Sequence, residues 1–304
     1  AGTDPARAGA PLPQDSGLKK PLVLGLVGPT ASGKSGLALR AALALGGEII
    51  CMDSMQVYRG MDIGTAKPTR EERALVPHHM LDVVAPDTPY SVAEYREQAA
   101  AAIAAVLARG HLPILCGGTG LYLRALSQNP QLGGAPADPA IREKWQALAE
   151  QSGNEAVHAA LMERDPESAR NLHPNNLRRV IRALEVLELT GQPFSAQRLQ
   201  SPEEGPYDLR LFALDWPRET LYRRVEERVG RMLDAGLVTE VRALLDSGLD
   251  PAAQSMQGLG YKELVPYLRG EMPLLDCAEL LSRRTRNYAK RQLTWFRADR
   301  RVRW

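Results

Sequence analysis

The pattern with the clearest chemistry is GPTASGKS, at residues 28–35. It follows the apolar run Leu22–Val27 and precedes a helix-like stretch, the order that a phosphate-binding loop requires. Glycines let the backbone wrap closely, and N–H groups at the helix N-terminus then point at an anion. The expected phosphate loop consists of Gly28, Pro29, Thr30, Ala31, Ser32, Gly33, Lys34 and Ser35.

Two side chains of the phosphate loop add specific functions. Lys34 supplies a positive charge for phosphate oxygens, and the hydroxyl of Ser35 can hold Mg²⁺. The motif does not reveal which phosphate compound is bound. That choice depends on residues elsewhere in the chain.

Polar residues follow two other apolar runs. Asp53 comes after Ile49–Met52, where it could bind Mg²⁺, act as a general base or cap a turn. The run Leu112–Cys116 is followed by two glycines and Thr119, whose hydroxyl can donate to an anionic oxygen. This second run carries no carboxylate, which disfavours an ATP hydrolase or kinase.

These residues need a scaffold in which strands and helices alternate. Such alternation with short connections indicates a parallel sheet covered by helices on both faces. Because ligands bind at the carboxyl ends of parallel strands, the phosphate loop, Asp53 and Thr119 should share one crevice. We predict an α/β fold with a P-loop NTPase-like parallel sheet. Its expected strands are 22–27, 48–52, 80–84, 112–116 and 209–214, and its expected helices are 34–45, 91–110, 217–236, 237–245, 257–268 and 274–296.

The alternation stops over residues 128–206, which contain helix signals and no convincing strand. Asp-Pro pairs at 138–139 and 165–166 are typical of helix N-termini, and 175–189 forms an amphipathic pattern closed by glycine. We therefore expect an all-helical insertion domain at 128–206 within a core of 21–127 and 207–304. Residues 1–20, rich in Ala, Gly and Pro, are expected to form a disordered tail.

The formal net charge of +2 is small, but basic residues are clustered. One cluster lies on the helix around Arg178, another follows Pro217, and a third fills the C-terminus together with aromatic residues. Basic and aromatic side chains in alternation suit looped RNA, whose phosphates need neutralising and whose bases stack. Three scattered cysteines and the lack of a membrane-length apolar run favour a cytoplasmic protein with buried thiols.

Six motifs together resemble the tRNA dimethylallyltransferase family, from about Pro21 to the C-terminus. They are GPTASGKS (28–35), DSMQVYRGMDIGTAKPT (53–69), GGTGLYLRAL (117–126), HPNNLRRVIRALEV (173–186), GLGYKE (258–263) and KRQLTWFR (290–297). The resemblance implies transfer of a dimethylallyl group from dimethylallyl diphosphate to the exocyclic amine of the adenosine directly 3′ of the tRNA anticodon. The products are isopentenyladenosine in tRNA and pyrophosphate.

The resemblance also assigns roles to residues. Asp53 becomes the general base, while Lys34, Thr119 and Arg228 stabilise the diphosphate leaving group with Mg²⁺ on Ser35. The target base must leave the anticodon loop to reach a pocket. The implied tRNA-binding residues are Asp53, Ser54, Met55, Gln56, Arg178, Arg179, Val180, Ile181, Arg182, Gln257, Gly258, Leu259, Gly260, Tyr261, Lys262, Lys290, Arg291, Gln292, Leu293, Thr294, Trp295, Phe296 and Arg297.

Three alternatives remain at this stage. A small-molecule kinase explains the phosphate loop and Asp53 but not the basic, aromatic C-terminus. An isopentenyltransferase acting on free adenine nucleotides would not need the helical insertion, and a non-catalytic RNA-binding protein would not need Lys34, Ser35, Asp53 and Thr119 together. The expected partners are the tRNA anticodon stem-loop and dimethylallyl diphosphate, with the protein acting as a monomer and away from membranes.

Overall fold

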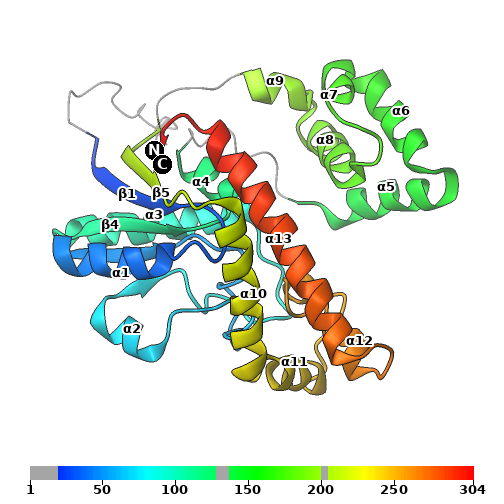
Figure 1. Ribbon diagram of the computed structural model, residues 1–304. Coiled ribbons are helices and arrows are strands. Elements are labelled where there is room, and N and C mark those ends of the chain that lie inside the picture. Colours follow the sequence, from blue (N-terminus) through cyan, green and yellow to red (C-terminus); the bar gives the residue numbers. More distant parts are fainter. Residues whose placement is uncertain (1–19, 128–136, 200–204) are drawn as a thin grey trace, which may run out of the picture.

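The computed structural model describes residues 20–127, 137–199 and 205–304 (Figure 1). The tail expected over residues 1–20 therefore lies outside the described residues, apart from Lys20. Two short segments at the ends of the expected insertion, 128–136 and 200–204, also lie outside them.

Within the described ranges, six strands form one parallel sheet in the order β3-β2-β4-β1-β5-β6. This confirms the predicted fold class, and four of the expected strands appear with ends shifted by one residue at most. The strands are β1 (Leu22–Val27), β2 (Gly47–Cys51), β3 (His78–His79), β4 (Leu112–Gly117), β5 (Asp208–Ala213) and β6 (Val302–Arg303).

The strand expected over residues 80–84 is wrong. Met80 and Asp82 adopt positive φ angles of 66° and 55°, which interrupt an extended backbone. Only Val84 forms an isolated parallel bridge, with Tyr58. The strand that pairs with the other edge of β2 lies just before this run, at the two histidines of β3.

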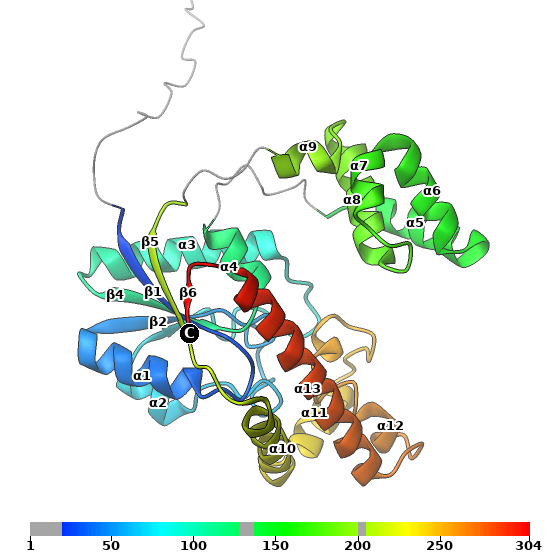
Figure 2. The same ribbon diagram turned by 45° about the horizontal axis from the view of Figure 1, so that its top comes forward.

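Helices cover the sheet on both faces, and Figure 2 shows α1 and α3 on opposite sides of it. The long helices α10 and α13 pack against each other beside the carboxyl ends of the strands (Figure 1). None of the described helices is both long and apolar enough to span a bilayer. The helices of this part are α1 (Lys34–Leu45), α2 (Arg70–Leu75), α3 (Val92–Ala108), α4 (Gly120–Ser127), α10 (Arg218–Asp234), α11 (Leu237–Asp246), α12 (Val265–Leu268) and α13 (Leu274–Ala298).

The helix expected over residues 257–268 is mostly wrong. A short 3₁₀ turn, Ser255–Gln257, is followed by turns, and only α12 is helical. Gly258 has an extended backbone and Gly260 a φ of 94°, so neither continues a helix. The segment consequently folds as a loop against the rest of the core.

The remaining helices form a group with its own apolar cluster. They are α5 (Pro139–Ser152), α6 (Asn154–Arg164), α7 (Pro166–Arg170), α8 (Leu177–Thr190) and α9 (Phe194–Leu199). Asp138 and Asp165 cap α5 and α7 as expected, accepting hydrogen bonds from first-turn N–H groups. Trp145, Val157 and Leu184 belong to a buried cluster separate from the core around the sheet.

Candidate active site at the carboxyl edge of the sheet

Three loops meet because β2, β4 and β1 are neighbours in the sheet. The N–H of Ser54 donates to Thr119 Oγ1 at 3.1 Å, and the N–H of Thr119 donates to the Met52 carbonyl at 3.3 Å. A side chain on Gly117 would collide with the Met52 backbone, so this crossing requires glycine. The structure thus brings the loops after β2 and β4 together, as the sequence predicts.

The phosphate loop has the backbone of an anion site. Gly28 and Gly33 adopt φ angles of 126° and 91°, in the region that favours glycine. Gly33 precedes α1 without a side-chain cap, and the first turn of α1 holds no acidic residue. The first N–H groups of α1 are therefore available to an anion, and the helix dipole favours negative charge there.

Lys34 lies over this loop, and its Nζ donates to the Pro29 carbonyl at 3.0 Å. Burial lowers the pKa of Lys34, and the nearby Arg228 cation acts in the same direction, whereas Asp53 raises it. These mutual effects show that Lys34, Arg228 and Asp53 share one electrostatic environment.

Helix α10 supplies two arginines one turn apart. Arg224 Nε donates to the Ala31 carbonyl at 2.7 Å, and its guanidinium lies 4.9 Å from the centre of the Trp216 ring. Trp216 in turn donates from Nε1 to the Ser32 carbonyl at 2.8 Å. Arg224 therefore holds the phosphate loop in place, a role that the sequence does not reveal.

Arg228 is placed to act on a ligand. Burial lowers the pKa of its guanidinium, and Asp53 raises it. Among the described residues, Arg228 has no hydrogen-bond or ion-pair partner, although it is half-buried. A half-buried cation without a partner at this position suits a multiply charged anion.

The two carboxylate oxygens of Asp53 differ in their hydrogen bonds. Its Oδ1 accepts from the N–H groups of Met55 and Gln56 at 2.8 and 3.3 Å, while Oδ2 has no hydrogen-bond donor among the described residues. Burial and the Asp53 charge both raise the pKa of Tyr288, whose hydroxyl lies close to Thr119. Asp53 thus both fixes the turn and presents a free carboxylate oxygen.

The motif at residues 53–69 includes a loop whose polar side chains face inward. In the structure Lys67 is buried, and its Nζ donates to the Tyr58 carbonyl, Asp62 and Asp82 at 2.6–2.8 Å. Glu240 on α11 accepts from the N–H groups of residues 62–64 and from the hydroxyl of Tyr261. This inward-facing loop supports the turn that carries Asp53.

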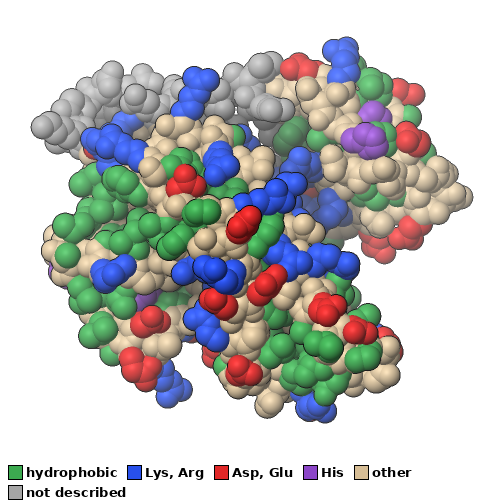
Figure 3. Space-filling model, in the orientation of Figure 1, with side chains coloured by type: hydrophobic (Ala, Val, Ile, Leu, Met, Phe, Trp, Pro, Cys, Tyr) green, Lys and Arg blue, Asp and Glu red, His purple; other side chains and the backbone are tan. Residues whose placement is uncertain are grey.

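The expected tRNA-binding residues range from exposed to buried. Arg178, Arg179, Lys290 and Arg291 are exposed, and Figure 3 shows Lys and Arg side chains gathered around α13 and toward the insertion. Arg182 is half-buried and pairs with the buried Glu185 at 2.6 Å. Buried side chains in the expected set are Val180, Ile181, Tyr261, Gln292 and Phe296.

The buried members support the exposed ones from beneath. The side chains of Val180 and Ile181 are buried in the apolar cluster of helices α5–α9, so they hold α8 in place and are not themselves at the surface. Gly258 packs against Met55, which places the 257–262 segment beside the Asp53 turn. The assignment of the whole set to tRNA remains a prediction.

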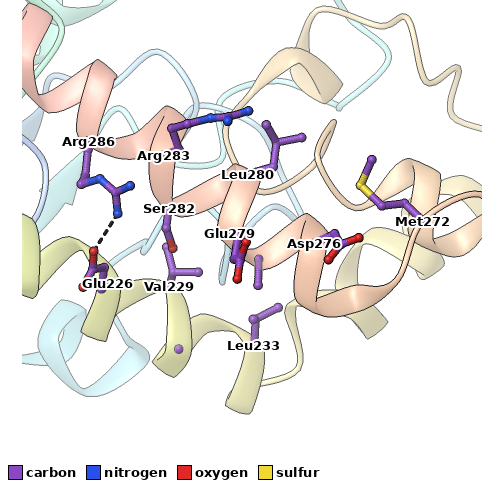
Figure 4. Close-up of a pocket in the computed structure, with 12 residues that line it drawn as sticks. Glu226, Val229, Leu233, Met272, Asp276, Glu279, Leu280, Ser282, Arg283 and Arg286 are labelled. Carbon is purple, nitrogen blue, oxygen red and sulfur yellow. Dashed lines mark hydrogen bonds and ion pairs between the residues drawn. The ribbon is translucent and has the colours of Figure 1, made fainter.

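A groove of about 700 Å³ lies elsewhere on the α10–α13 pair (Figure 4). Val229, Leu233 and Met272 line it together with the ion pair between Glu226 and Arg286, 2.7 Å apart. It includes no residue of the phosphate loop and none of the groups around Asp53. The chemistry therefore points to the sheet edge rather than to this groove.

The sheet order, the phosphate loop and the facing cations define a P-loop α/β protein with a free carboxylate beside its anion site. The family model described as IPP transferase matches residues 56–299. The chain belongs to this family.

Relatives match along nearly the whole chain. A tRNA dimethylallyltransferase of Pelotomaculum thermopropionicum is 53% identical over 94% of this chain and 90% of its own length. The crystal structure of a tRNA isopentenylpyrophosphate transferase from Bacillus halodurans is 44% identical, with a TM-score of 0.69, covering 94% of this chain and 89% of that one. A eukaryotic dimethylallyltransferase, described as acting on tRNA, has a TM-score of 0.79 at 31% identity over 91% of this chain and 70% of its own.

Proposed function

We propose that this protein is a tRNA dimethylallyltransferase that uses dimethylallyl diphosphate as donor. The acceptor is the exocyclic amine of the adenosine directly 3′ of the anticodon. The observation that carries this proposal is the free oxygen of Asp53 beside two cations at a phosphate loop, in a chain of this family. The same arrangement disfavours the kinase alternative, because β4 ends in glycines rather than in a carboxylate.

The reaction breaks the allylic C–O bond and forms a C–N bond. The electron pair of the broken bond stays with the bridging oxygen of the diphosphate, and Lys34, Arg228 and the loop N–H groups face the charge that develops there. Thr119 adds a hydroxyl on the neighbouring loop. The amine nitrogen takes the dimethylallyl group, and its proton passes to Asp53 Oδ2. Pyrophosphate and the prenylated adenosine are the products.

The donor set fits a Mg²⁺ ion that is held mainly by the substrate. No group of three or more His, Cys, Asp or Glu residues within the described ranges could hold a metal. The exposed hydroxyl of Ser35 lies at the first turn of α1, so Ser35 together with diphosphate oxygens and water would hold the ion. When bound, Mg²⁺ neutralises charge on the diphosphate.

The acceptor requires a larger surface than the anion site. We assign residues 128–206 to an insertion domain that contacts the anticodon stem, and the exposed face of α13 to the anticodon loop. Arginines there would bind phosphates, so affinity should depend on salt. The enzyme acts as a monomer in the cytoplasm, where its tRNA substrate is found.

A transfer assay tests the function. The protein receives labelled dimethylallyl diphosphate, Mg²⁺ and either an anticodon stem-loop RNA with adenosine 3′ of the anticodon or free AMP. Label on the stem-loop alone supports the proposal. Label on AMP indicates the free-nucleotide alternative. Label on neither acceptor contradicts the proposal, and ATP turnover in a separate assay without RNA would then indicate a kinase.

A further inference from the structure

The side chain of Gln292 joins two loops of the anion site. Its Oε1 accepts from the N–H of Thr30 in the phosphate loop at 2.8 Å, and its Nε2 donates to the carbonyl of Gly118 at 2.9 Å. Gln292 is only 6% exposed, although it lies within a helix whose other side is basic and exposed. The amide thus bonds both loops from a third segment far away in the sequence.

The side chain of Gln292 is closely packed, which restricts its amide to this position. A side chain at Gly118 would collide with the Gln292 amide, and one at Gly120 would collide with the Trp295 ring. Tyr288, one turn before Gln292, has its hydroxyl close to both Thr119 and Gln292. Tyr288, Gln292 and Trp295 therefore form a stripe of α13 that faces the loops.

The opposite side of α13 is exposed. Lys290 and Thr294 lie on it. Arg291 is also exposed but flanks the inner stripe, and its guanidinium is 5.7 Å from the centre of the Tyr288 ring. The exposed side of α13 thus carries the expected RNA surface, and the buried side contacts the loops of the anion site. A shift of α13 along its axis would move the Gln292 amide relative to both loops.

We infer that Gln292 is a positioning residue that sets the geometry of the diphosphate site by tying the phosphate loop and the 117–120 loop to α13. This inference rests on the proposed function only in taking the anion to be a diphosphate. Without Gln292, the N–H of Thr30 and the carbonyl of Gly118 each lose a buried partner. The phosphate loop then samples positions that bind the diphosphate less well.

Binding of inorganic pyrophosphate with Mg²⁺, measured by calorimetry, tests the inference on the full chain. Gln292→Met keeps the length of the side chain but removes both hydrogen bonds, and we expect its Kd for pyrophosphate to rise about tenfold. The matched control is Gln254→Met, because Gln254 also bridges two segments through two bonds to the backbone of Tyr90. Its Kd should stay within about twofold of that of the unmodified protein.

Two readouts separate positioning from general destabilisation. In Gln292→Met we expect the KM for dimethylallyl diphosphate to rise, while the Kd for the stem-loop changes less than about twofold. Gly118→Ala supplies a second variant, because its methyl group would displace the Gln292 amide in an otherwise intact helix. It should weaken pyrophosphate binding in the same way.

Specific results would overturn the inference. Unchanged pyrophosphate affinity in Gln292→Met or in Gly118→Ala would do so, as would an equal loss in Gln254→Met. Pyrophosphate binding requires neither RNA nor turnover. A failed transfer assay would therefore reject the proposed function without deciding the role of Gln292.

Discussion

At the scale of single residues, the two oxygens of Asp53 have different roles. Asp53→Asn keeps an oxygen that can accept from the N–H groups of Met55 and Gln56, but its amide cannot take a proton. We expect kcat to fall roughly 10²- to 10⁴-fold, with stem-loop affinity within about threefold of the unmodified protein. Single-turnover transfer and gel-shift binding measure the two quantities. Normal turnover in this variant would remove Asp53 from the proton transfer.

Arg228 and Arg224 provide a comparison of two cations on one helix. Arg228→Gln removes the cation that has no protein partner in the described structure, so the developing charge on the diphosphate loses stabilisation. We expect kcat to fall roughly 10²- to 10³-fold. In Arg224→Gln the bond to the Ala31 carbonyl is lost, and the KM for dimethylallyl diphosphate should rise more than kcat falls. Steady-state kinetics of both variants measure kcat and KM. A fall mainly in kcat for Arg224→Gln and a rise mainly in KM for Arg228→Gln would contradict the two assignments.

At the scale of elements, Glu48 fastens the opposite end of the sheet. This buried carboxylate at the start of β2 accepts from Arg109, His79 and His111 at 2.6–3.0 Å. The hydrogen bonds from Arg109 lower the pKa of Glu48 most, and those from the two histidines lower it further. Burial raises it, but the net result is a pKa of about 2. Strand β2, the adjoining β3 and the end of α3 thereby share one charged cluster.

The sign of the pH dependence follows from that depressed pKa. The ionised carboxylate stabilises the fold above an unfolded pKa of 4.5, and the contribution is lost as pH falls toward about 2. Glu48→Gln should lower the free energy of unfolding by about 2–3 kcal/mol at pH 7, and by much less at pH 2. Urea unfolding across this range measures it. A difference between the two proteins that does not depend on pH would contradict the assignment.

The sequence predicts an element well when neighbouring residues determine it, and poorly when residues from other segments do. Strands β1 and β4, the start of α3 next to Ser91 and the end of α8 at Gly191 follow from neighbouring residues and were predicted. The 80–84 run has positive φ angles at Met80 and Asp82, and Asp82 pairs with Lys67 and Arg73, which lie outside the run. The loop from Gly258 makes contacts that are distant in sequence, of Gly258 with Met55 and of the Tyr261 hydroxyl with Glu240.

The same distinction applies to the site. Motif spacing and the family resemblance predicted the loops that carry Lys34, Asp53 and Thr119, and the sheet order brings them together. The inward roles of Gln292 and Arg224 come from pairs that are far apart in sequence, with separations of 262 and 174 residues for Gln292 and 193 for Arg224. The spacing of Tyr288, Gln292 and Trp295 on α13 was the available sequence signal, since it marks one face of a helix.

At the scale of the whole molecule, the basic side chains divide into those that pair with buried carboxylates and those that are exposed. Arg142 and Arg182 neutralise Glu185, which is fully buried in the insertion, and Arg284 neutralises the buried Glu263. These arginines hold their own parts of the fold together. Lys290, Arg178 and Arg179 are exposed and form none of these ion pairs, so they remain for an external polyanion.

The division of arginines predicts different outcomes for neighbours on α8. Arg178→Gln combined with Arg179→Gln should raise the stem-loop KM about tenfold with kcat nearly unchanged, and should reduce the slope of log Kd against log salt by about one per lost phosphate contact. Arg40→Gln on α1, also at an exposed arginine, is the control and should leave both unchanged. Arg182→Gln instead removes a partner of buried Glu185, so its larger effect should be on thermal stability. A fall in kcat at saturating stem-loop for the 178/179 variant would place α8 in the chemical step, and an unchanged salt slope would remove it from the tRNA surface.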